Sequence, residues 1–163
     1  MTTHPLHPNH AIALPVPTAV PPFTLHDTDG RPYSPTQLPA DKPLILVFYR
    51  GDWCPYCQLQ MHQLSQVYEQ IVARGADIWA ISPQTQAENQ AFRAKRNIPF
   101  PILGDETLTV IREWGLEDEL DPDDEHIPYP TTYIVLNGQT IWRKLGRRKD
   151  DRPTPGEIMA ALP

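Results

Sequence analysis

The sequence has only two cysteines, Cys54 and Cys57, among 163 residues. A scaffold held together by several disulfides is therefore excluded, and the fold must rest on an apolar core. The sequence also lacks an apolar run of the roughly 20 residues that cross a bilayer, so we expect no membrane-spanning helix. A net charge of −6 disfavours binding to nucleic acid or to an anionic membrane surface.

Length and composition predict a single globular domain. A chain of 163 residues is close to the size of one domain, and 40% hydrophobic with 21% charged residues argues against disorder along its whole length. The first residues contain several prolines and no Lys or Arg, unlike a secretory signal peptide. We therefore expect a cytoplasmic protein.

Proline is abundant, and ten of the 20 prolines lie in the first 43 residues. Because proline fixes φ and lacks an N–H group, this part of the chain cannot be helical. We expect residues 1–20 to form a flexible tail and residues 21–163 to form the domain. An Asp29–Gly30 pair predicts a small hairpin at the start of that domain.

The remaining sequence alternates between strand and helix patterns. Strands are predicted at 44–49, 76–81 and 100–103, and as a hairpin at 133–136 and 139–142. Helices are predicted at 57–74, 84–96, 106–114 and 155–162. This order predicts an α/β fold, a three-layer α/β/α sandwich around a central mixed sheet.

The motif with the clearest chemistry is Trp53-Cys54-Pro55-Tyr56-Cys57, where the first buried strand gives way to the long helix. Partial positive charge at a helix N-terminus favours thiolate, the reactive form of cysteine. Pro55 suits a first helical turn, and Trp53 can shield one side of the pair. A zinc site would need two more ligands, but His62 and His126 are isolated in the sequence. Two inert core cysteines are an alternative that the strand–helix context disfavours, so we predict a redox pair.

A second feature is the segment Tyr129-Pro130-Thr131, directly before the predicted hairpin. A proline here is most often only the boundary of a strand. A cis bond at Pro130 would instead present the backbone of Tyr129 to a substrate polypeptide or to glutathione.

These features together resemble the thioredoxin-like superfamily. Residues 48–57, 80–83 and 100–105 resemble its peroxiredoxin-like branch, the alkyl hydroperoxide reductase/thiol-specific antioxidant family. The resemblance extends over about residues 20–162. It implies an N-terminal hairpin and an inserted strand and helix at 100–114, which plain thioredoxins lack.

The resemblance leaves open which sulfur attacks. The thioredoxin pattern implies attack by Cys54 and resolution by Cys57, whereas the peroxiredoxin pattern places the peroxide-reactive sulfur at Cys57. Peroxiredoxins usually have Thr or Ser three residues before that sulfur, and this chain has Cys54. The family also requires a guanidinium near the thiolate. Arg152, which precedes Pro155 as in the family's Arg-x-x-Pro, and Arg50 are the candidates, with a solvated surface role as the alternative for each.

The resemblance implies an antioxidant enzyme that reduces peroxides through a Cys54–Cys57 dithiol–disulfide cycle. Thioredoxin or glutathione would be the reductant, a homodimer is one implied assembly, and neither a metal nor an organic cofactor is required. The alternatives are a general thiol–disulfide oxidoreductase and a redox sensor without turnover.

Other charged groups have simpler interpretations. His4, His7 and His10 recur every three residues and could share one face of a polyproline helix to bind a metal, but incidental histidines in a tail are the favoured interpretation. The acidic run 117–125 does not match an EF-hand calcium loop and is expected to be a solvated loop. Basic residues from 143 to 152 form a cluster that could dock an acidic partner.

Overall fold

The computed structural model describes residues 7–119 and 126–163. The strands are β1 (Leu25–His26), β2 (Pro32–Tyr33), β3 (Leu44–Phe48), β4 (Asp77–Ser82), β5 (Ile102–Gly104), β6 (Thr131–Leu136) and β7 (Gln139–Leu145). The helices are α1 (Pro55–Ala73), α2 (Gln86–Arg96), α3 (Thr109–Glu113) and α4 (Pro155–Ala161), with 3-10 turns at Pro8–Ala11 and Pro35–Gln37. The predicted order of strands and helices is confirmed, with ends displaced by a few residues.

In the described part of the chain, the seven strands form one mixed sheet in the order β2-β1-β5-β4-β3-β6-β7. β3 and β5 run parallel to β4, whereas β6, β7 and the small β1–β2 hairpin are antiparallel to their neighbours. β3 lies between β4 and β6, and all five of its residues are buried. The cysteine motif follows in the chain after the carboxyl end of β3.

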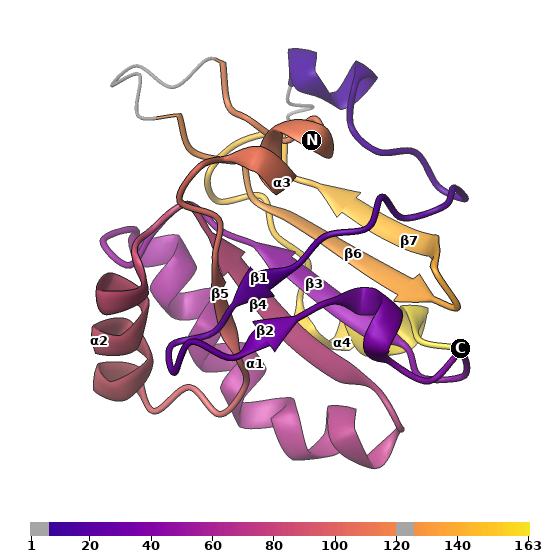
Figure 1. The fold of residues 1–163 in the computed structure, drawn as a ribbon, viewed down its shortest axis with the longest axis horizontal. Helices are drawn as coiled ribbons and strands as arrows, with labels where there is room; N and C mark the ends of the chain where they lie inside the picture. The colour runs from indigo at the N-terminus through magenta and orange to yellow at the C-terminus, as the bar shows by residue number, and fades with distance from the viewer. Residues whose placement is uncertain (1–6, 120–125) are drawn as a thin grey trace.

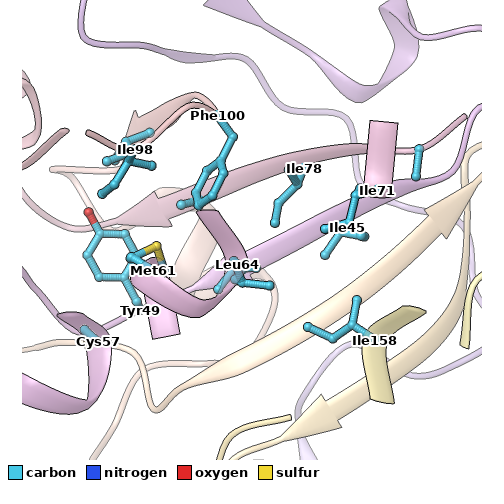
Figure 2. Packing of buried hydrophobic residues seen from close by; sticks show 14 of the residues in the cluster. Ile45, Tyr49, Cys57, Met61, Leu64, Ile71, Ile78, Ile98, Phe100 and Ile158 are labelled. Atoms are coloured by element: carbon cyan, nitrogen blue, oxygen red, sulfur yellow. The ribbon is translucent and has the colours of Figure 1, made fainter. Parts of the chain in front are cut away.

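Alternate residues of β3 belong to two different cores, as the two-residue period of a strand requires. Ile45 and Val47 face a cluster covered by α1, α2 and α4, which includes both cysteines. Leu46 and Phe48 face a second cluster, covered by α3 and the N-terminal segment. Figure 1 shows α1 and α4 behind the sheet and the indigo N-terminal part of the chain in front of it, and Figure 2 shows the first cluster from close by. The three-layer arrangement is confirmed.

The N-terminal segment (residues 7–20) differs from the expected flexible tail. Its backbone is bonded to the domain: the Leu14 N–H donates to the Trp114 carbonyl over 2.9 Å, and the Val20 N–H donates to the Gly138 carbonyl over 2.8 Å. The Tyr133 hydroxyl and the Arg143 guanidinium donate to the Leu14 carbonyl over 2.6 and 2.7 Å. Residues 1–6, including His4, lie outside the described residues.

The reason for this packing is that α3 has only five residues. A helix of that length cannot cover the large apolar side chains on its face of the sheet, among them Trp79, Trp114 and Tyr133. The extended segment supplies the missing cover with Ala13 and the partly buried Leu14. Proline density correctly indicated a largely extended chain, but it missed the 3-10 turns at Pro8–Ala11 and Pro35–Gln37 and gave no sign of whether the chain was packed. In the described residues, no helix is long and apolar enough to cross a membrane.

Gly115 allows the N-terminal segment to approach, and this can be tested. Its φ is +70°, and a Cβ added there would lie 2.2 Å from the Ile12 carbonyl oxygen. We expect Gly115→Ala to lower the free energy of unfolding by about 2 kcal/mol or more, since it adds a backbone clash to the cost of a left-handed residue. Gly138→Ala is the control, because its φ is +72° with no atom within 4 Å of the added Cβ. Urea unfolding should show only about 1 kcal/mol for the control, and equal losses would contradict the packing argument.

Candidate active site

Both cysteines lie where β3 connects to α1. Cys54 is the N-cap residue of α1, Pro55 occupies the first helical position, and Cys57 lies in the first turn. The two thiols are free. Cys57 packs into the first core cluster beside Met61 and Tyr49, as Figure 2 shows. The predicted position of the pair at the start of a helix is confirmed.

Two arginines from distant parts of the sequence reach the sulfurs. Arg152 Nη2 lies 3.2 Å from Cys57 Sγ and 3.8 Å from Cys54 Sγ. Arg50 Nη1 lies 3.6 Å from Cys54 Sγ, and its guanidinium lies 5.1 Å from the centre of the Trp53 ring. Both arginine candidates thus contact the cysteine pair, and Arg152 contacts both sulfurs.

The surroundings of the two thiols shift their pKa values in opposite directions. A hydrogen bond from the Cys57 thiol lowers the pKa of Cys54 to about 5, and the charges of Arg152 and Arg50 act in the same direction. Burial raises the pKa of Cys57 above its ordinary range, and the hydrogen bond to Cys54 raises it further. The arrangement therefore holds Cys54 as the thiolate and Cys57 as the protonated thiol that supports it.

Arg152 is itself held in place from both sides. Its Nη1 donates to Gln60 Oε1 over 2.8 Å, and its Nε donates to the Lys149 carbonyl over 2.9 Å. Gln60 is only 5% exposed and lies one helical turn after Cys57. Gln60 was not predicted from the sequence. Its spacing of three residues from Cys57 was the available signal, since that spacing puts both side chains on one face of α1.

The loop before Cys54 is fixed by a second residue that was not predicted, Gln84. Its amide accepts from the Asp52 backbone N–H over 2.9 Å and donates to the Asp52 carboxylate over 2.8 Å. Gln58 donates from α1 to the Asp52 carbonyl over 2.8 Å. Because Gln84 follows β4, this clamp depends on the parallel pairing of β3 with β4, which no local sequence pattern reveals.

Of the two interpretations of Tyr129-Pro130-Thr131, the strand boundary is confirmed, because β6 begins at Thr131, and the cis bond is not found. Among the described residues the one cis peptide bond is Val16–Pro17, so Pro130 follows a trans bond. The backbone of Tyr129 is already paired, since its N–H donates to the Leu116 carbonyl and its carbonyl accepts from the Thr131 hydroxyl. It therefore offers no pairing edge to a substrate. The segment lies near the site in another way, because Tyr129 and Pro130 line a cleft that also contains Arg50.

Both cysteines are covered, with exposed fractions of 1% for Cys54 and 0% for Cys57. Two surface clefts lie on either side of the exposed Tyr56. The larger, of about 420 Å³, is lined by Arg50, and the smaller, of about 120 Å³, is lined by Arg152. Each cleft is thus bounded by a guanidinium that touches a sulfur.

The histidines considered for metal binding have other partners. His7 lies 2.7 Å from Asp118, and its Nδ1 accepts the Asn9 backbone N–H, so the Nε2 nitrogen carries the proton toward Asp118. His10 Nε2 lies 2.9 Å from the Gly146 carbonyl oxygen. Within residues 7–119 and 126–163, no group of three or more metal-ligating side chains is found. The predicted solvated loop falls largely on residues 120–125, outside the described residues.

Comparisons with known proteins agree with this geometry. A model of the AhpC/TSA family matches residues 16–143. The chloroplastic peroxiredoxin Q of Sedum lineare is 37% identical over 100 residues, covering 61% of this chain and 53% of that protein. That of Gentiana triflora is 33% identical over 124 residues, covering 76% and 55%. The chain therefore spans about half the length of the curated relatives it matches.

Solved structures show the same fold. A peroxiredoxin-like protein from Aquifex aeolicus superposes with a TM-score of 0.81 at 13% identity, covering 92% of this chain and 86% of that chain. Peroxidoxin BcpB from Mycobacterium tuberculosis superposes with a TM-score of 0.77 at 20% identity, covering 91% and 94%. At these levels of sequence identity, the superpositions show a shared fold and nothing about activity.

The acidity of Cys54 can be measured directly. We expect the ultraviolet absorbance of thiolate in the reduced protein to rise with a midpoint near pH 5, because the ionised form of Cys54 is stabilised. Thiolate should be lost about tenfold per unit as the pH falls below that value. The Cys54→Ser variant should lose this transition and keep only one above the ordinary thiol range, from Cys57. A midpoint near pH 5 that persists in Cys54→Ser and disappears in Cys57→Ser would reverse the assignment.

Proposed function

The chain belongs to the AhpC/TSA family, and we propose that it is a peroxiredoxin Q-like thiol peroxidase that reduces hydroperoxides with Cys54 and Cys57. The observation that carries the proposal is the placement of two guanidinium groups against two free thiols at the start of α1. Such a site stabilises a thiolate and supplies donors to the oxygen that leaves during O–O cleavage.

In the first step the Cys54 thiolate attacks one peroxide oxygen. An S–O bond forms, the O–O bond breaks, and the second oxygen departs as an alkoxide or hydroxide that takes a proton from solvent. Cys54 is then a sulfenic acid, and the peroxide has been reduced to an alcohol or water. Arg152 and Arg50 lie where they can stabilise both the attacking sulfur and the departing oxygen.

In the second step the Cys57 thiol attacks the Cys54 sulfenic acid, and water leaves as the disulfide forms. Cys57 already hydrogen-bonds to Cys54, so this step requires neither a second copy of the chain nor unwinding of α1. Two electrons from an external thiol reductant then restore the dithiol.

Thioredoxin and glutathione remain the proposed reductants, and the cytoplasmic location and a homodimer remain predictions.

Cys54 is chosen as the attacking sulfur because more hydrogen-bond donors face its sulfur than face Cys57. Its sulfur faces the Cys57 thiol and both arginines, whereas Cys57 lies deeper in the core and is held protonated. This favours the thioredoxin-like assignment over the peroxiredoxin-like one for the order of attack, although the overall reaction is that of a peroxidase.

Trapping of the sulfenic acid tests this assignment. In the Cys57→Ser variant, hydrogen peroxide should convert Cys54 to a sulfenic acid that a dimedone-type reagent captures, because no resolving thiol remains. The Cys54→Ser variant should form little adduct, and mass spectrometry of the modified peptide gives the readout. Adduct on Cys57 in Cys54→Ser alone would reverse the roles. Sluggish oxidation of the wild type by every peroxide, with rapid exchange against disulfides, would refute the peroxidase.

The contribution of Arg152 is a separate prediction. We expect Arg152→Gln to lower the second-order rate constant for oxidation by hydrogen peroxide about 10²–10³-fold, the range typical for loss of one donor to a developing oxyanion. Stopped-flow recording of tryptophan fluorescence suits the measurement, because Trp53 is next to Cys54. Arg96→Gln on α2 is the matched control, since Arg96 is exposed and lies on a different helix. Equal rate constants for the two variants would contradict the role given to Arg152.

A further inference from the structure

The larger cleft beside the cysteine pair has a volume that hydrogen peroxide alone does not require. At about 420 Å³ it falls within the range of pockets that hold small organic ligands. Tyr56, which is 40% exposed, and Tyr129 both line it. The Tyr129 ring is fixed by stacking on His7 at 4.6 Å between ring centres. Tyr56 therefore offers most of the aromatic surface of the cleft, and the buried Tyr129 ring adds a fixed edge against which an organic group can pack.

The charge of the cleft is predominantly positive. Its lining contains four cationic side chains and two carboxylates: Arg50, Arg147, Arg148, Lys149, Asp118 and Asp150. Both carboxylates have partners within the lining, since Asp118 bonds to His7 over 2.7 Å and Asp150 pairs with Arg148 over 2.5 Å. Arg147 is also paired, with Asp151 outside the lining over 2.8 Å, so the positive charge available to a ligand comes mainly from Arg50 and Lys149, and it favours an anion.

Of these two cations, Arg50 contacts the reactive sulfur and Lys149 does not. The Lys149 side chain is exposed, while its carbonyl accepts from Arg152 and so ties its backbone to the group that contacts both sulfurs. Arg50 also lines the cleft, and its Nη1 lies 3.6 Å from Cys54 Sγ. An anionic group near Lys149 would leave the rest of the molecule directed toward Arg50 and the reactive sulfur.

We propose that this cleft is a binding subsite for small organic molecules that carry a carboxylate, with Lys149 as a recognition residue and Tyr56 and Tyr129 as the walls. The inference rests on the proposed function, because it names the chemical class that the same site accepts. Two sources share this chemistry: an organic hydroperoxide with a carboxylate, which oxidises Cys54, and a thiol with a carboxylate, which reduces the disulfide.

Equilibrium binding tests the subsite without any turnover. The probes are the para-carboxylate of cumyl alcohol, which is the product left by the corresponding hydroperoxide, and its methyl ester. Ligand-observed NMR titration should give a Kd for the carboxylate that is lower by about fivefold or more than that of the ester. Lys149→Glu should bring the ratio of the two Kd values close to one. Lys95→Glu, which makes the same change of net charge on α2, should leave the ratio as in the wild type.

Three binding outcomes would overturn the proposal. They are equal affinity for acid and ester in the wild type, absence of binding by either, and equal weakening by Lys149→Glu and Lys95→Glu. The last result would mean that bulk charge, and not the cleft, attracts the anion.

Kinetic arms then separate the two sources. The para-carboxylate of cumene hydroperoxide and its methyl ester are compared as oxidants of the reduced protein, and mercaptopropionate and its methyl ester as reductants of the disulfide. Preference for the acid in the first pair assigns the subsite to the oxidant, and preference in the second pair assigns it to the reductant; preference in neither overturns the proposal. If no peroxide oxidises the thiols, the peroxidase proposal fails, while the binding titration still decides the subsite.

Discussion

The guanidinium of Arg152 contacts the sulfurs of both Cys54 and Cys57, and its positive charge favours the ionised form of either thiol. Two neighbouring thiols buried in a core would ordinarily both stay protonated, because burial penalises a charged sulfur. A fixed cation at 3.2 to 3.8 Å stabilises one thiolate at that depth. The hydrogen bond from Cys57 to Cys54 then determines that the charge resides on Cys54.

Several parts of the fold act to keep that guanidinium in place. Gln60 holds one nitrogen from α1, and the Lys149 carbonyl holds another from the chain before α4. Two residues after Arg152, Thr154 caps α4 and exchanges hydrogen bonds with Glu157, so the position at which the helix begins is fixed. The site is therefore assembled from the start of α1 and the segment before α4, at a sequence separation of 95 residues between Cys57 and Arg152. Anything that displaces α4 from α1 should also displace the charge from the sulfurs.

The sequence predicted most of the fold because its patterns are local. Leu44–Phe48 is apolar without alternation, which is the pattern of a strand covered on both faces, and Asn137–Gly138 is a hairpin turn. The sequence did not predict that residues 7–20 pack against the domain. Whether an extended segment packs depends on how much of one sheet face the short helix α3 leaves uncovered. The sequence also left the isomer at Pro130 open, because the isomer of a prolyl bond depends on tertiary contacts.

The sequence by itself determined the reactive pair. Cys54 and Cys57 are adjacent in the chain, and the proline between them together with the apolar stripe that follows places them at a helix start through interactions a few residues long. The family resemblance named Arg50 and Arg152 as candidates, but only the tertiary structure decided which groups lie against the sulfurs and at what distance. Arg152 is 95 residues from Cys57 and Gln84 is 32 residues from Asp52, and no propensity or spacing relates positions so far apart. The electrostatic field at a sulfur depends on distances in space, and those distances exist only once the strands have paired and the helices have packed.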